Sequence, residues 1–335
     1  MPSRTRCELK KVAWSSILVA TLLLTVAVTV EGQQPKKVVR IGFLGGTASF
    51  SVIELKVFRE RLRELAYIEG QNTTIKPRYW EGKIEVLPNT VAELVGLKCD
   101  VIVTTGTEAV LAVKNATKTI PVVMGFSGDA VTLGIIADLA RPGGNITGLT
   151  SINSELSGKR LELLKEVHPR LARVALLWNP GNPNTEYFLK ETESAANALQ
   201  VRIQSLEVLK PEEFEGVFHD AITRRAQGLM LGGGGFLSAH RKRIVELAAK
   251  NRLAGIYPNF QYVDAGGLMA YAEDRTYMFR RAAEYVDKVL KGAKPADLPV
   301  ERPKKFDLVI NLNAAKQIGL NIPQSVLYRA DKVVK

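Results

Sequence analysis

The sequence predicts an α/β protein of two doubly wound parallel-sheet lobes joined by a multi-strand hinge. Between residues 38 and 140, a strand pattern and a helix pattern alternate four times, which is typical of one doubly wound lobe. The alternation begins again after residue 151. The strand patterns are short apolar runs, as expected for parallel strands buried on both faces.

The helices and strands of the first lobe are predicted from the spacing of apolar residues. Leu55, Phe58, Leu62 and Leu65 recur at intervals of three and four, which predicts an amphipathic helix. By the same reasoning we expect strands at residues 38–44, 74–80, 100–104 and 120–125, and helices at residues 51–66, 84–97, 106–115 and 133–140.

The second lobe repeats the scheme. Pro211 suits the first turn of one helix, and Ser238 is the expected cap of another. We expect strands at residues 173–178, 201–208, 228–231, 255–257, 268–271 and 306–312, and helices at 154–167, 184–199, 211–224, 239–251 and 314–318. A long helix is also expected at residues 276–290.

Residues 141–151, RPGGNITGLTS, separate the two alternating series. Pro142 lacks a backbone donor and ends the preceding helix pattern. Gly143 and Gly144 loosen the backbone, and residues 145–149 alternate as a strand does. We expect the chain to cross between the lobes here, with a ligand cleft beside the crossing.

Two long motifs resemble a known family. The runs ADLARPGGNITGLTS and GGLMAYAEDRTYMFRRAAEYVDKVLKGAKPADLPVERPKKFDLVINLNAAKQIGLNIP resemble signatures of bacterial ABC-transporter substrate-binding proteins, the group with tryptophan- and tyrosine-binding members. The resemblance implies a type I periplasmic-binding-protein fold and a second crossing near residues 272–275. Lobe 1 would then hold residues 36–150 and about 273–300, and lobe 2 residues 151–272 and about 301–335. Sequence leaves the lobe of the last segment open.

The first 32 residues read as a secretory signal peptide. Arg4, Arg6, Lys10 and Lys11 precede the apolar residues 12–30, and small residues near Gly32 suit cleavage. We expect a periplasmic mature protein. An uncleaved membrane anchor is the alternative, because about 19 apolar residues can just span a bilayer.

Charge and cysteine content narrow the function classes. The net charge is +12, and it is +10 without residues 1–32, which carry four basic and two acidic residues. Lys and Arg are scattered among Glu on helices, so we expect no nucleic-acid partner. Cys99 is alone in the mature chain, which predicts a buried thiol and no intramolecular disulfide.

The ligand site is expected in loops that follow strands, because ligands of parallel α/β sheets bind beyond the carboxyl ends of the strands. Thr105, Gly106 and Thr107 lie between a strand and a helix. Their hydroxyls and the free N–H groups of the helix start suit a ligand carboxylate. The alternative is that Thr105 or Thr107 merely caps its own helix.

Other loops supply further candidates. Thr47 and Ala48 lie in the loop after the first predicted strand, and they are candidates for the same reason. Asp129 is a candidate for a ligand ammonium or for a helix cap. Tyr257, Trp178 and Phe236 can stack on a planar ligand or belong to the core. The remaining candidates are Ser127, Asn179, Asn182, Gly233 and Asp274.

Enzyme signatures are lacking. The three histidines, His168, His219 and His240, lie on or beside predicted helices, away from these loops. We therefore expect no catalytic residues, no metal site and no cofactor.

The sequence and the resemblance together predict a monomeric binding protein. We expect it to close on a small carboxylate-bearing solute, such as an aromatic amino acid or related acid, and to deliver that solute to the membrane permease of an ABC importer. A binding protein that feeds a receptor kinase is the alternative.

Overall fold

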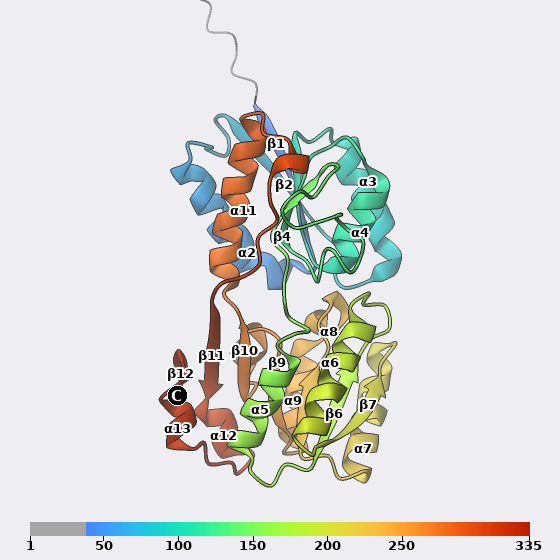
Figure 1. Cartoon of the computed structure of the whole chain (residues 1–335), viewed down its shortest axis with the longest axis vertical. Coiled ribbons are helices and arrows are strands. Elements are labelled where there is room, and N and C mark those ends of the chain that lie inside the picture. The colour runs from blue at the N-terminus through green and yellow to red at the C-terminus, as the bar shows by residue number, and fades with distance from the viewer. Residues whose placement is uncertain (1–37) are drawn as a thin grey trace, which may run out of the picture. The chain divides into compact units, whose positions relative to one another are not determined.

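A computed structural model describes residues 38–335, so the predicted signal peptide lies outside the described residues. The described chain contains two sheets (Figure 1). The predicted α/β class with two mostly parallel sheets is confirmed.

The first sheet is parallel throughout, with the strand order β2-β1-β3-β4-β5. Its strands are β1 (Val39–Gly45), β2 (Thr73–Tyr79), β3 (Val101–Thr105), β4 (Val122–Phe126) and β5 (Ile146–Gly148). Neighbouring helices are α2 (Ala48–Glu64), α3 (Leu87–Gly96), α4 (Thr107–Ala116) and α11 (Arg275–Leu290), with short 3₁₀ turns η1 (Ile84–Val86) and η3 (Pro295–Asp297).

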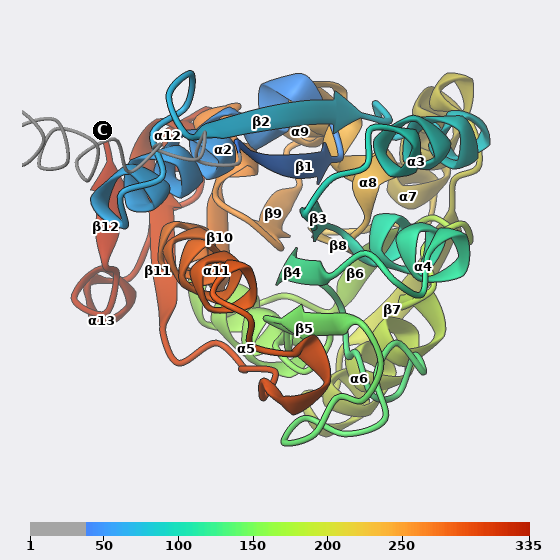
Figure 2. The same cartoon turned by 90° about the horizontal axis from the view of Figure 1, so that it is seen from above.

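Helices cover both faces of this sheet, as Figure 2 shows, with α2 and α11 on one side and α3 and α4 on the other. Phe43, Phe58 and Phe279 pack together on the first side. Leu44 and Val110 belong to the core on the second side. Consecutive residues of β1 therefore enter opposite cores, which is why the strand is apolar along its length.

The second sheet has the order β12-β11-β10-β9-β8-β6-β7, and β11 runs antiparallel to β10. Its strands are β6 (Arg173–Trp178), β7 (Arg202–Glu207), β8 (Gly228–Leu231), β9 (Ala254–Tyr257), β10 (Met269–Glu273), β11 (Phe306–Asn311) and β12 (Lys332–Val334). Its helices are α5 (Ser157–Val167), α6 (Thr185–Ala198), α7 (Phe214–Thr223), α8 (Gly235–Ala239), α9 (Arg241–Lys250), α10 (Gln261–Asp264), α12 (Leu312–Gln317) and α13 (Gln324–Leu327), with a 3₁₀ turn η2 (Pro211–Glu213).

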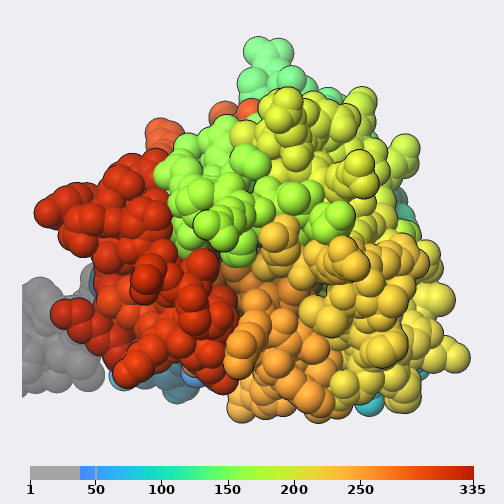
Figure 3. All heavy atoms as spheres, turned by 90° about the horizontal axis from the view of Figure 1, so that it is seen from below, coloured from blue at the N-terminus to red at the C-terminus, as the bar shows by residue number. Residues whose placement is uncertain are grey.

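The C-terminal segment completes this second sheet. β12 pairs with β11, and α13 packs against α5. Figure 3 shows the C-terminal residues, in red, beside the green segment that contains α5. The sequence patterns did not predict α10, α13 or β12, because each has only three or four residues.

We call β1–β5 with α2, α3, α4 and α11 lobe 1, and β6–β12 with their helices lobe 2. Three segments connect the lobes: residues 149–156, Asp274 and residues 298–305. The first and third run side by side, since Leu149 and Glu301 form a parallel bridge and the Thr150 N–H donates to the Glu301 carbonyl at 3.0 Å. The second and third are joined where the Asp274 N–H donates to the Lys305 carbonyl at 3.4 Å.

The helix expected at residues 133–140 is wrong, because two aspartates start separate turns there. Asp129 accepts the N–H groups of Val131 and Thr132, and Gly134 then has a φ of 61°. Asp138 accepts the N–H groups of Ala140 and Arg141.

Two helices begin at residues that differ from the expected ones. The helix expected from Ser154 begins at Ser157, since the Ser154 carbonyl is used in a turn with the Ser157 N–H. Ser238 does not cap a helix. It lies inside α8, and the chain leaves helical geometry at His240 before α9 begins.

Candidate ligand-binding site

A cavity lies where the carboxyl ends of the strands in the two lobes face each other. Of the twelve sequence-predicted site residues, seven line it: Thr47, Thr105, Gly106, Thr107, Asp129, Asn182 and Gly233. Strands of both lobes end at this cavity because their sheets are parallel at the positions concerned.

The start of α4 forms one wall. Gly106 precedes the helix with a φ of 94°, a conformation that suits glycine. Gly106 occupies the cap position without a side-chain cap bond, so neither Thr105 nor Thr107 acts as the cap, and the Glu108 carboxylate bonds its own N–H in the first turn. The positive end of the helix dipole therefore faces the cavity beside Gly106 and Thr107.

Arg275 brings a positive charge to the same wall. Its Nη2 donates to Thr105 Oγ1 at 3.0 Å and pairs with Glu54 Oε1 at 2.8 Å. Its guanidinium carbon lies 4.2 Å from the centre of the Phe126 ring. Burial raises the pKa of Glu54, and the charge of Arg275 opposes that rise.

Carboxylates line other parts of the cavity. Glu108 is 7% exposed, and burial raises its pKa, although the Gly235 N–H donates to its Oε1 at 3.2 Å. Glu273 Oε1 accepts from Ser151 Oγ at 2.5 Å and from the Ile152 N–H at 3.1 Å. With Asp129 and Glu155 also in the lining, the cavity can accept a cationic group as well as an anionic one.

The aromatic lining differs from the expected one. Trp80, Phe126, Tyr187 and Phe188 line the cavity. The three aromatic candidates from the sequence have other contacts. Trp178 donates its indole N–H to Ser205, and Phe236 stacks on Phe214. Tyr257 is buried and stacks on Tyr262 with ring centres 4.9 Å apart, and burial raises its pKa.

Five predicted site residues do not line the cavity: Ala48, Ser127, Asn179, Tyr257 and Asp274. Three of them are engaged in local backbone structure. The Ala48 N–H donates to Glu81, Asn179 bonds the Val208 carbonyl and the Gly181 N–H, and Asp274 caps α11 by accepting the Tyr277 N–H. Ser127 is fully buried.

Sequence reasoning missed several lining residues: Trp80, Glu108, Asn184, Asn259, Glu273 and Arg275. Arg275 had a readable signal, because a cation at the N-terminus of a helix is electrostatically unfavourable unless something else requires it. Asn184 lies in a loop after a predicted strand, so its position was a signal, whereas Glu273 had none.

Arg160 supports the floor of the cavity from behind. It is 1% exposed, and it donates to the Tyr271 carbonyl and to both oxygens of Asn153. Burial lowers its pKa to about 10. Since Asn153 lines the cavity, this buried cation fixes the first connecting segment against β10.

The lobes touch directly beside the cavity. Asn184 Nδ2 of lobe 2 donates to Thr107 Oγ1 of lobe 1 at 2.6 Å. The Gly235 N–H of lobe 2 also donates to Glu108 Oε1 of lobe 1. The lobes are therefore held together across the cleft in this structure.

Comparison with known proteins gives the family. The model of the family described as ABC transporter substrate binding protein matches residues 52–334. This chain belongs to that family. It is a substrate-binding protein of an ABC transporter.

Relatives of this binding protein agree with the assignment. A tyrosine-binding protein of Clostridioides difficile is 22% identical over 265 residues, which cover 79% of this chain and 76% of that protein. A solved structure described as an ABC domain in complex with L-Trp from Streptococcus pneumonia has a TM-score of 0.81 and 25% identity, covering 88% of this chain and 99% of the other. A conserved domain protein of Vibrio cholerae has a TM-score of 0.83 and 24% identity, covering 89% of this chain and 100% of the other.

The expected fold class is therefore confirmed as that of type I periplasmic binding proteins. Within residues 38–335, no helix combines the length and apolar character needed to cross a membrane.

Proposed function

We propose that this binding protein is the exported component of an importer and that it closes its lobes on an amino acid with an aromatic side chain, or on a related acid. The observation that carries the proposal is the cavity between the lobes, whose lining includes a helix start, Arg275, several carboxylates and four aromatic side chains. Such an arrangement suits a small zwitterion.

We propose that the carboxylate of the ligand binds at the start of α4. The positive end of the α4 dipole at Thr107 favours a negative charge, and the guanidinium of Arg275, which pairs with Glu54, lies beside Thr105. Charge-assisted hydrogen bonds of this kind are roughly twice as strong as neutral ones.

In this proposal, the ammonium group of the ligand binds beside carboxylates of the cavity. Glu273 and Asp129 line the cavity, and Glu273 has one oxygen already oriented by Ser151 and Ile152. A ligand ammonium would offset the negative charge that these groups hold in a largely buried site.

The aromatic group is placed among Trp80, Phe126, Tyr187 and Phe188. Aromatic rings prefer offset or edge-to-face packing against each other, which contributes about 0.5–1.5 kcal/mol beyond burial. The names of the two relatives, one binding tyrosine and one in complex with L-Trp, support the same ligand class.

Export, the permease and the lack of enzyme activity are part of this proposal. Residues 1–32 have the pattern of a signal peptide. A family of ABC-transporter substrate-binding proteins implies delivery to a permease, and it gives no support to the receptor-kinase alternative. A solute-binding role requires neither a catalytic residue nor a cofactor.

A thermal-shift panel of amino acids and aromatic acids tests the ligand class. A compound at 100 times its dissociation constant should add about 2.7 kcal/mol to the free energy of unfolding. L-tryptophan and L-tyrosine should raise the melting temperature, and L-lysine should not. If none of the aromatic compounds raises it, the proposed ligand class is wrong.

A double substitution tests the carboxylate position. Thr105→Ala with Thr107→Ala should weaken L-tryptophan binding by about 30-fold in calorimetry, because each lost hydrogen bond contributes about 1 kcal/mol. Thr223→Ala is the matched control, since Thr223 Oγ1 donates only to the His219 carbonyl on the surface of α7. Equal affinity in the double variant and the wild type would remove the α4 start from the site.

A further inference from the structure

The contact between Thr107 and Asn184 has a third member, Gly128, which follows β4 in lobe 1. Thr107 Oγ1 accepts from the Gly128 N–H at 2.9 Å and from Asn184 Nδ2 at 2.6 Å. All three residues line the cavity. The side chain that helps form the start of α4 therefore also joins the two lobes.

Asn184 is held in place from within lobe 2. Its N–H donates to Asn182 Oδ1 at 3.0 Å, and Asn182 Nδ2 donates to the Gly233 carbonyl at 2.8 Å. Asn184 precedes α6, yet its side chain does not cap that helix. Its amide is directed to the other lobe instead.

Gly128 leaves the space that Asn184 occupies. A Cβ atom on Gly128 would lie 2.1 Å from Asn184 Oδ1 and 2.4 Å from Asn184 Nδ2. The φ of Gly128 is not in the left-handed region, so its backbone conformation accepts alanine. A side chain at residue 128 would therefore displace the Asn184 amide from its present position without straining the backbone.

We propose that Asn184 is a positioning residue that couples ligand binding to lobe closure, by joining Thr107 in the space that Gly128 leaves. The inference rests on the proposed function, because it gives Thr107 two roles: it lies beside the ligand carboxylate and it receives the closing lobe. The contact exists only when the lobes are together, so it stabilises the closed form selectively.

Single substitutions should weaken binding for different reasons. Gly128→Ala opposes closure by a clash, and it should weaken L-tryptophan binding by about tenfold or more. Asn184→Ala loses one hydrogen bond, and it should weaken binding by about fivefold. Both effects should appear mainly as faster dissociation, because the closed form is what retains the ligand.

The double variant separates this proposal from a merely local role. Asn184→Ala removes the atoms that clash with a side chain at residue 128, so the double variant should bind within about threefold of Asn184→Ala alone. Independent roles, with Gly128 shaping its loop and Asn184 touching only the ligand, would instead multiply to about 50-fold. A multiplied loss would overturn the proposal.

Matched controls use the same chemical changes elsewhere. Gly216→Ala in α7 meets no atom within 4 Å, and Asn251→Ala removes an amide that bonds only the Leu247 carbonyl. Neither should change binding. Circular dichroism and urea unfolding establish that each variant folds. If Gly128→Ala does not fold, the closed populations of Asn184→Ala and the wild type are compared instead, and equal populations would overturn the proposal.

Closure is also measured without ligand. Dyes at Lys56→Cys and Lys190→Cys, on exposed positions of α2 and α6, report the distance between the lobes by single-molecule energy transfer. The closed population should fall in Gly128→Ala, and in the double variant it should return to the level of Asn184→Ala alone. Equal populations in all three proteins would overturn the proposal. Failure of L-tryptophan to bind the wild type would instead count against the proposed ligand class alone.

Discussion

At the scale of single residues, Glu108 combines burial with a position on the cavity wall. It is 7% exposed, and its pKa lies above the ordinary value of 4.5 because burial disfavours the charged form. The Gly235 N–H and the N–H of Glu108 itself oppose this shift. A carboxylate held this way weakens folding when ionised, which is consistent with a group kept for its role in the cavity.

The pH dependence of stability should reflect this shift. A raised folded pKa adds stability below pH 4.5 that is lost as the pH rises through the folded value. Glu108→Gln should therefore be more stable than the wild type at pH 7, by about 1 kcal/mol, and lose that advantage at pH 4. Urea unfolding at both pH values measures it. Exposed Glu207→Gln is the control, and a pH-independent difference for Glu108→Gln would contradict the assignment.

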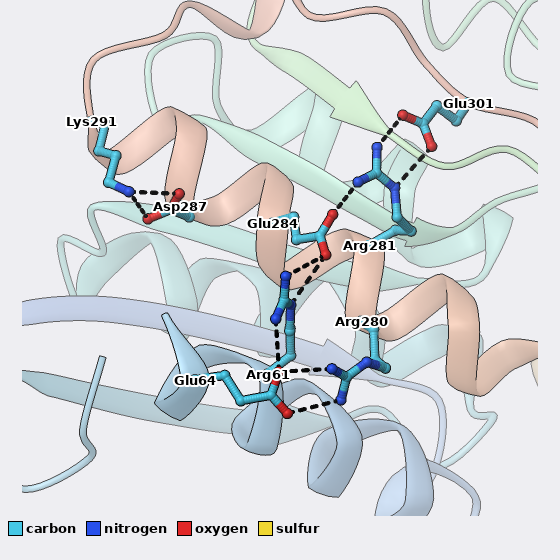
Figure 4. A network of polar contacts seen from close by, with 8 residues as sticks. All are labelled: Arg61, Glu64, Arg280, Arg281, Glu284, Asp287, Lys291 and Glu301. Carbon is cyan, nitrogen blue, oxygen red and sulfur yellow. Dashed lines mark hydrogen bonds and ion pairs between the residues drawn. The ribbon is translucent and has the colours of Figure 1, made fainter. Parts of the chain in front are cut away.

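At the scale of elements, α11 is tied to its surroundings by ion pairs along one face (Figure 4). Arg280 pairs with Glu64 of α2 at 2.7 Å, and Glu284 pairs with Arg61 of α2 at 2.8 Å. Arg281 pairs with Glu301 of the third connecting segment at 2.5 Å and also with Glu284. α11 therefore fixes one end of the hinge to lobe 1.

Loss of the Glu301 pair should loosen that attachment. The guanidinium of Arg281 lowers the pKa of Glu301, so its contribution to stability is present above pH 4.5 and is lost as the pH falls through the lowered value. Glu301→Gln should lower the free energy of unfolding by about 1 kcal/mol at pH 7 and by much less at pH 3.

Calorimetric or urea unfolding of Glu301→Gln measures this difference, which should also shrink in 1 M salt because the pair is partly exposed. Glu162→Gln is the control, since it breaks an exposed pair with Lys159 that should contribute little. A loss that is the same at pH 3 and pH 7 would assign the effect to packing and not to charge.

At the scale of the whole molecule, the contacts of Asn184 and Glu108 join the lobes beside the cavity. A binding protein that uses closure should exchange this arrangement with one in which the lobes are apart. The three connecting segments remain when the lobes part. Arg160 holds the first of them to β10, and the bridge between Leu149 and Glu301 joins the first to the third.

Solution scattering should detect the exchange. Addition of L-tryptophan should reduce the radius of gyration of the wild-type protein, because the ligand stabilises the form in which the lobes touch. The variant with Thr105→Ala and Thr107→Ala should show no reduction at the same concentration. An identical radius with and without every compound that binds would contradict closure as the mechanism.

The sequence by itself determined the two alternating series and several of the loops that reach the cavity. The spacing of apolar residues is a local property of the sequence. The rule that ligands bind beyond the carboxyl ends of parallel strands depends only on topology, so neither requires coordinates. They placed Thr105, Gly106 and Thr107 at the cavity. They also gave a false helix at residues 133–140, because the hydrogen bonds of Asp129 and Asp138 compete with helix formation.

Only the tertiary structure decided which side chains from distant elements meet. Arg275 reaches Thr105 across 170 positions of sequence, and Asn184 reaches Thr107 across 77. Tyr257 had a loop position that suited a ligand wall, yet it stacks inside lobe 2. No local pattern encodes these outcomes, because they depend on how α11 packs on lobe 1 and on how closely the two lobes approach.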